Sequence, residues 1–150
     1  GYAIVNEELA NYFAKWLTNT ISCTATFTQM AGNTAIAEDK GPSIAMVQEF
    51  QKRRDLIHNR LNKIDGISTV LPKGAFYIFA NVTGACEKLN LKNSLELQDY
   101  FLEKLDVAVL SRTYFGNRIS DEKEEYIRFS YCISRENIIK GMDRIENVLS

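Results

Sequence analysis

The 150-residue chain lacks any apolar run of about 18 residues, the length that a membrane-spanning helix requires. It also lacks an excess of one charge, because 18 basic residues stand against 19 acidic ones and the net charge is -1. This balance gives no electrostatic reason to expect a nucleic acid or an anionic membrane as partner. No secretory signal peptide is visible. We therefore expect a cytoplasmic protein that binds neither nucleic acid nor membrane.

Cysteine and histidine are scarce as well. The three cysteines are far apart and form no C-x-x-C pair, and the single His58 cannot complete a zinc site with them on spacing alone. No Ser/His/Asp set and no phosphate-binding loop is present. The sequence therefore predicts no metal site, and we interpret Cys23, Cys86 and Cys132 as reduced thiols.

The residues that are present are those of an ordinary globular domain, 45% hydrophobic and 25% charged. Helical spacing of apolar residues, with stops between the segments, predicts helices over 6–21, 29–37, 43–64, 93–105 and 134–149. The predicted N-caps are Asn6 for the first helix, Asn93 or Ser94 for the fourth and Ser134 for the last. Short apolar or alternating runs predict strands over 1–5, 67–71, 75–82, 107–110 and 125–133. This pattern indicates an α/β (α+β) fold, a small mixed or antiparallel sheet with helices on one face, which the first forty residues fit poorly.

The stretch EYIRFSYCI, residues 125–133, carries the strongest functional signal. Ile127, Phe129, Tyr131 and Ile133 alternate with polar or half-polar neighbours, as in a strand with one face on a core. Arg128 lies at the centre of the opposite face. A guanidinium fixed in this way can bind an anion, but the residues alone favour a solvated or ion-paired arginine.

Several ordered motifs resemble the C-terminal part of the fold type I, pyridoxal-phosphate-dependent class I/II aminotransferases, of the aspartate aminotransferase type. The match runs through essentially the whole chain. Its segments are GYA at 1–3, SCTATFTQ at 22–29, RRDL at 53–56, LNKIDGI at 61–67, PKGAFYIF at 72–79, VAVL at 107–110, FG at 115–116 and YIRFSY at 126–131.

The resemblance implies that Arg128 binds the α-carboxylate of an amino-acid or 2-oxo-acid substrate. It implies pyridoxal 5'-phosphate as the cofactor and a homodimer as the intact enzyme. In the family the hairpin that contains Gly74 closes over the active site, so Gly74 is a second candidate for substrate binding. The alternative for Gly74 is a turn glycine with a positive φ angle.

The sequence departs from the family at one loop. Ser111 and Arg112 replace the usual Pro-Gly, which leaves the shape of the loop open. We expect residues 111–125 to be solvated, Arg112, Tyr114 and Arg118 included.

The family's Schiff-base lysine lies upstream of the matched region, so no residue here corresponds to it. We therefore expect a fragment that does not transaminate alone: residues 1–42 as the end of the large, cofactor-binding domain, and residues 43–150 as the small domain. Severed apolar surface around Tyr2, Ile4, Phe13 and Trp16 predicts self-association. The alternative is a free-standing, non-catalytic α/β module in which Arg128 binds a carboxylate ligand or a protein partner.

Overall fold

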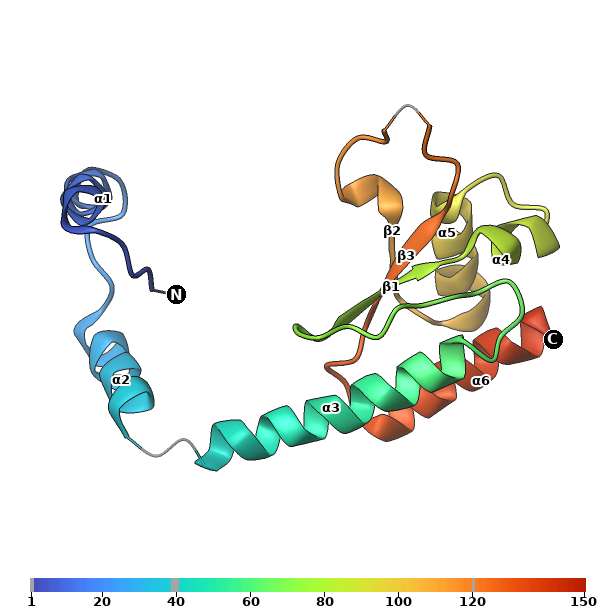
Figure 1. Ribbon diagram of the computed structural model, residues 1–150, viewed down its shortest axis with the longest axis horizontal. Helices are drawn as coiled ribbons and strands as arrows, with labels where there is room; N and C mark the ends of the chain where they lie inside the picture. The colour runs from blue at the N-terminus through green and yellow to red at the C-terminus, as the bar shows by residue number, and fades with distance from the viewer. Residues whose placement is uncertain (1, 39–40, 120) are drawn as a thin grey trace. The chain divides into compact units, whose positions relative to one another are not determined.

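The computed structural model describes residues 2–38, 41–119 and 121–150 (Figure 1). Contacts within the chain divide it into two compact units, Gly1–Ser43 and Ile44–Ser150. The described residues form six α-helices, one short 3-10 helix and a three-stranded sheet, so the chain is a mixed α/β protein. None of the helices in these ranges combines the length and the apolarity needed to cross a membrane.

The first unit contains two helices, α1 (Glu7–Thr20) and α2 (Thr26–Ala37). The predicted cap of α1 is confirmed, because the Asn6 Oδ1 accepts a hydrogen bond from the Leu9 N–H at 2.9 Å. The predicted strand at 1–5 is wrong for residues 2–5, which have no regular structure, and Gly1 lies outside the described residues. An isolated strand has no partner for its backbone hydrogen bonds. None of the described residues of this unit is buried.

The long helix α3 (Gly41–Leu61) begins two residues before the predicted start and ends three before the predicted end. The chain then turns through Gly66, which has a φ of +83°. A β-carbon built on Gly66 would lie 2.6 Å from the Ala85 backbone nitrogen. Gly66 is therefore required both for its conformation and for the close approach of the two backbone segments.

The sheet consists of β1 (Tyr77–Asn81), β3 (Tyr126–Ser130) and β2 (Leu110–Ser111) in that order, with both pairings antiparallel. The predicted strand at 67–71 is wrong, because only Ser68 forms a bridge, to Asn81. The Pro72 that follows has no N–H to extend the pairing. The predicted strand at 107–110 is reduced to its last residue, which pairs with the centre of β3.

Three further helices complete the second unit: α4 (Thr83–Lys88), α5 (Ser94–Leu105) and α6 (Arg135–Leu149). The sequence did not predict α4. The caps predicted for the other two are confirmed, since the Asn93 side chain accepts from two backbone N–H groups and the Ser134 side chain from one.

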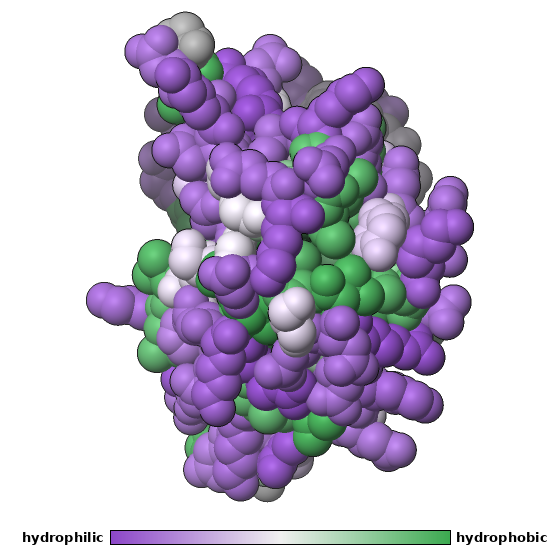
Figure 2. Space-filling model, turned by 90° about the vertical axis from the view of Figure 1, so that its right-hand side faces the viewer, coloured by the Kyte–Doolittle hydropathy of each residue, from purple (hydrophilic) through white to green (hydrophobic). Residues whose placement is uncertain are grey.

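The hydrophobic core lies on one side of the sheet. Ion pairs of Arg135 with Glu49, and of Arg60 with Asp143 and Glu146, hold α3 and α6 side by side (Figure 1). On the face drawn in Figure 2, hydrophobic residues form a central area and a few smaller groups within a largely hydrophilic surface. Buried core residues include Ile78 and Ala80 of β1, Ile127 and Phe129 of β3, Leu61 of α3, Leu97 and Phe101 of α5, and Ile138 and Ile145 of α6.

Candidate functional site

Arg128 occupies the centre of β3, on the sheet face opposite the core. Its Cα neighbours across the sheet are Phe79 of β1 and Leu110 of β2. The flanking residues Ile127 and Phe129 are buried on the core face. The predicted alternation is therefore confirmed across the strand, and the packed face fixes the backbone from which Arg128 projects. Ile133, predicted on the same face as Ile127, follows the end of the strand and is exposed.

The Arg128 guanidinium lies between two aromatic rings. Its Cζ is 4.1 Å from the ring centroid of Tyr77 and 4.9 Å from that of Phe115. Contact with the ring faces stabilises the cation by cation–π attraction and limits the orientations of the guanidinium plane. The N–H groups of the Arg128 guanidinium have no hydrogen-bond acceptor in the described part of the chain.

Arg128 is also unusual in having no carboxylate beside it among residues 2–38, 41–119 and 121–150. The chain has eight arginines, all of them described. Seven form an ion pair: Arg53, Arg54, Arg60, Arg112, Arg118, Arg135 and Arg144. Arg128 is thus a half-buried cation that is held in place yet available to an external anion.

A hollow of about 180 Å³ lies beside Arg128. It is lined by Ala108, Val109, Leu110, Arg128 and Ser130. Apart from Arg128, its charged side chain, the lining consists of small or aliphatic residues and one hydroxyl. A carboxylate group fits such a space, and the planar guanidinium offers two parallel N–H donors to it.

Gly74 lies in a different hollow, of about 190 Å³, which also includes Gln51, Arg54 and Lys73. It shares no described lining residue with the hollow at Arg128. The expected positive φ is wrong for Gly74, since the neighbouring Ala75 has the positive φ, of 59°. A β-carbon on Gly74 would meet nothing within 4 Å. The structure therefore does not bring the two predicted substrate residues together.

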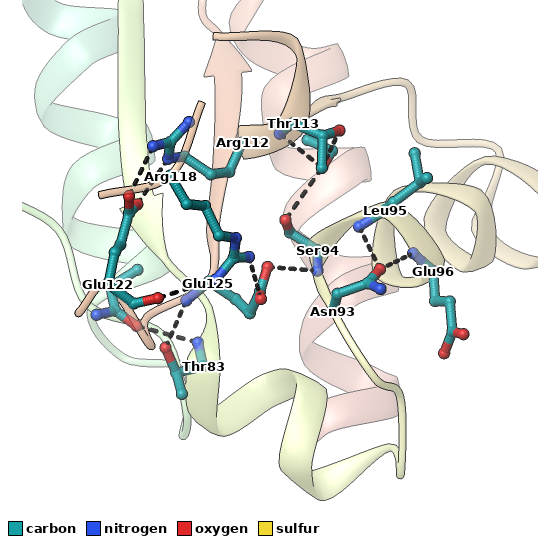
Figure 3. Close-up of polar contacts among 12 residues, drawn as sticks. Thr83, Asn93, Ser94, Leu95, Glu96, Arg112, Thr113, Arg118, Glu122 and Glu125 are labelled. Atoms are coloured by element: carbon teal, nitrogen blue, oxygen red, sulfur yellow. Dashed lines mark hydrogen bonds and ion pairs between the residues drawn. The ribbon is translucent and has the colours of Figure 1, made fainter. Parts of the chain in front are cut away.

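The expectation of a solvated loop at 111–125 is wrong for Arg112 (Figure 3). Arg112 is buried, and its Nε and Nη2 each donate to a different carboxylate oxygen of Glu122 at 2.6 Å. Arg118 pairs with Glu125. Tyr114 and Arg118, two of the three residues predicted to be solvated here, are exposed as expected. The Arg112 guanidinium holds the pKa of the Glu122 carboxyl below its ordinary value.

The buried carboxylate of Glu125 joins the end of this loop to α5. Burial raises the pKa of Glu125, but hydrogen bonds from Ser94 and Arg118 outweigh burial and leave the pKa below its ordinary value. The Ser94 N–H donates to this carboxylate at 2.8 Å, and the Glu125 N–H donates to the Thr83 hydroxyl at 2.9 Å. Sequence reasoning missed this network, because residues 121–125 resemble a solvated run of charge. The one signal for it was the presence of two arginines and several acids in one loop.

The described residues include neither a set of metal ligands nor a lysine suited to form a Schiff base with a cofactor. These residues contain no cluster of three or more His, Cys, Asp or Glu side chains that could hold a metal. All nine described lysines are exposed, whereas a Schiff-base lysine is typically desolvated in a pocket. The described residues therefore do not fit pyridoxal phosphate by themselves.

Comparison with known proteins places these features in a family. Residues 1–145 match the family model "Aminotransferase class I and II". The chain is 33% identical over 151 residues to a probable aspartate/prephenate aminotransferase of Aquifex aeolicus, and 32% identical over 151 residues to an aspartate aminotransferase of Pyrococcus horikoshii. Each alignment covers 99% of this chain but 36% of the relative. The chain thus spans about a third of the length of these relatives.

Solved structures agree. The crystal structure of an aspartate aminotransferase from Rhizobium meliloti matches 95% of this chain and 35% of its own, with a TM-score of 0.82 and 28% identity. An aromatic aminotransferase from Pyrococcus horikoshii matches 90% and 34%, with a TM-score of 0.76 and 32% identity. The likeness therefore extends from sequence to fold.

Proposed function

The chain belongs to the aminotransferase class I and II family, and from that premise we propose that Arg128 binds the carboxylate of an amino-acid or 2-oxo-acid substrate. The observation that supports the proposal is the environment of the Arg128 side chain. This arginine is fixed by a packed strand and two rings, adjoins a hollow, and has no carboxylate partner in the described residues.

The proposed contact would act by orienting the substrate. Two parallel hydrogen bonds from one planar guanidinium fix both the position and the plane of a carboxylate. The bond between the carboxylate carbon and the Cα of the substrate is thereby directed, which is a proximity effect on any reaction at Cα. The aliphatic side chains of Val109 and Leu110 limit water around the contact and strengthen it.

The family is pyridoxal-phosphate-dependent, and the cofactor belongs to the proposal for the intact protein. When bound, pyridoxal phosphate supplies the electron sink of the reaction. We assign none of its contacts to residues of this chain, because none of the described lysines is desolvated. In this proposal residues 1–42 are the end of the cofactor-binding domain and residues 43–150 are the small domain. That the intact protein is a homodimer of the cytoplasm is proposed on the family resemblance alone.

Substitution of Arg128 in the protein that carries this chain tests the carboxylate contact. Arg128→Gln removes the charge and the fork, so kcat/KM for the amino acid and for the 2-oxo acid falls by about 30-fold or more. Arg128→Lys keeps the charge without the fork and recovers part of the loss. Arg144→Gln, which breaks an exposed ion pair elsewhere, is the control and leaves kcat/KM unchanged. Equal kcat/KM values in wild type and Arg128→Gln would refute the assignment.

The cofactor part of the proposal has a separate test on the 150-residue chain alone. Added pyridoxal phosphate, followed by borohydride, gives no stoichiometric adduct on a single lysine. Absorbance and peptide mass analysis provide the measurement. A defined band locked onto one lysine would contradict the proposal that the Schiff-base lysine comes from outside this chain.

A further inference from the structure

The two rings that hold the Arg128 guanidinium have unequal support. Tyr77 belongs to β1, which pairs with β3 along its whole length. Phe115 follows the short helix η1 (Arg112–Tyr114), outside regular secondary structure, and is about two-fifths exposed. Regular strand pairing fixes the backbone of Tyr77. The ring of Phe115 packs edge-on against Phe79 of β1, with 5.6 Å between the ring centroids, but the backbone that carries Phe115 requires other interactions to keep the ring against Arg128.

Arg112 supplies these interactions on both sides of Phe115. Its carbonyl accepts the Phe115 N–H at 3.0 Å. Its guanidinium donates to the carbonyls of Gly116 and Asn117 at 2.9 and 3.1 Å. The chain closes around the Arg112 side chain by way of Gly116, whose φ is +97°. The backbone before and after the ring is thus bound to one residue.

Glu122 holds that guanidinium from the other side (Figure 3). Each of its carboxylate oxygens accepts one hydrogen bond from Arg112 at 2.6 Å, the two-pronged geometry of a strong charge-assisted pair. The two side chains are 11% and 15% exposed, so solvent screens the pair little. With these bonds and those to Gly116 and Asn117, all the guanidinium nitrogens of Arg112 have protein acceptors.

Ser111 anchors the start of the same loop to α5. Its N–H donates to the Gln98 Oε1 at 2.8 Å, and its hydroxyl lies 3.0 Å from that of Ser94. Proline has no N–H to make the first bond, and glycine has no side chain to take the place of Arg112. The two residues at which the sequence departs from the Pro-Gly of the family pattern are therefore those that hold the loop.

We propose that Arg112 and Glu122 are positioning residues, which hold Phe115 against Arg128 and so fix the direction of its guanidinium toward the carboxylate. The proposal rests on the proposed function of Arg128. It assigns the pair no contact with substrate or cofactor. Loss of either member frees the backbone around Phe115, and the edge contact with Phe79 is then too little to keep the ring of Phe115 against the Arg128 guanidinium.

Side-chain NMR of the full chain, labelled with 15N-arginine, measures this positioning directly. The ring currents of Tyr77 and Phe115 displace the Nε–H resonance of Arg128, which Arg128→Lys identifies by its absence. Phe115→Leu gives the resonance position without the second ring. The test variants are Arg112→Gln and Glu122→Gln. Arg144→Gln, which breaks the exposed pair with Asp106, is the matched control.

We expect the Arg128 resonance of both test variants to move most of the way toward its position in Phe115→Leu. Titration with succinate, as a simple carboxylate probe, then shows binding weakened by about 2- to 30-fold. The double variant Arg112→Gln/Glu122→Gln shows no larger change than either single one, because the two residues act as a unit. Arg112→Lys, which keeps charge without the fork, falls between wild type and Arg112→Gln.

A general loss of stability is separated from positioning by the core variant Ile145→Val. It lowers the urea midpoint through a residue that is fully buried in α6, and it leaves the Arg128 resonance and succinate affinity unchanged. The proposal is overturned if Phe115→Leu moves the resonance while Arg112→Gln and Glu122→Gln do not. It is also overturned if Phe115→Leu itself has no effect.

The proposed function fails in a different way. If succinate moves no Arg128 resonance of the wild-type chain, carboxylate binding by Arg128 is wrong for this chain, whereas the ring-current comparison among the variants still decides the positioning role.

Discussion

In the unit formed by residues 44–150, nineteen apolar side chains are buried, whereas the described residues of the unit 1–43 include no buried side chain. Both units contain well-formed helices. In the first unit, Leu9, Phe13, Trp16 and Leu17 recur at helical spacing along α1 but remain exposed. In the second, the same kind of spacing along α6 places Ile138, Met142 and Ile145 in a core.

The difference shows that helix formation and burial are separate requirements. A cap such as Asn6 satisfies backbone groups locally and starts a helix. Burial of the apolar face requires other elements to pack against it, and it supplies most of the stability of helices in proteins. The four predictions below test this difference between the two units, from the largest expected effect to the smallest.

Truncation of a phenylalanine in each unit gives the largest contrast. Phe101→Ala removes a fully buried side chain of α5 and lowers the free energy of unfolding by about 3–5 kcal/mol. Phe13→Ala removes an exposed one and changes it by no more than about 0.5 kcal/mol. Urea unfolding followed by circular dichroism at micromolar concentration measures both. Equal losses would show that α1 is covered by another surface.

Self-association tests the exposed face of α1. We expect the chain to associate at higher concentration, as exposed apolar patches do. Charges placed on this face, in Phe13→Asp/Trp16→Asp, weaken association by about tenfold or more, which sedimentation velocity detects. Ile139→Asp introduces a charge at an exposed apolar position of α6 and is the control. A chain that stays monomeric at every concentration would contradict this expectation.

A pH series tests how much the ion pairs of Glu49 on α3 contribute to the stability of the second unit. Hydrogen bonds from Arg135 of α6 and from Arg53 lower the pKa of Glu49 to about 2. Because the folded pKa lies below the ordinary 4.5, the stabilisation is present above pH 4.5 and is lost as the pH falls toward 2. The difference in urea midpoint between wild type and Glu49→Gln should therefore shrink across that window. A constant difference would mean that the charge of Glu49 contributes nothing.

Thiol labelling gives the smallest but most local contrast. Burial, with smaller contributions from Glu125, Glu87 and Glu96, raises the pKa of Cys86 to about 11, so little thiolate is present at pH 8. Cys23 of the first unit is exposed. Mass spectrometry after brief iodoacetamide treatment should find Cys23 modified, and Cys86 modified only after unfolding in urea. Rapid modification of Cys86 in the native chain would show that α4 opens easily.

Local patterns in the sequence predicted much of the second unit. The alternation around Arg128 placed the strand and its two faces, and the capping residues Asn93 and Ser134 placed two helix starts. The segment 67–71 failed because a strand forms only where a partner offers free backbone groups, and the pattern of one segment carries no information about its partner. The same limit explains Arg112, whose acceptor Glu122 lies ten residues away across a loop.

By itself, the sequence determined the caps, the apolar spacing of the helices and the family, because these depend on residues close together in the chain or on ordered motifs. Only the tertiary structure decided which arginine has no carboxylate beside it among the described residues. All eight arginines carry the same charge in the sequence. Whether one of them forms an ion pair depends on which segments the fold brings within a few ångströms of it. For Arg128 the fold placed two aromatic rings and a hollow there in place of an acid.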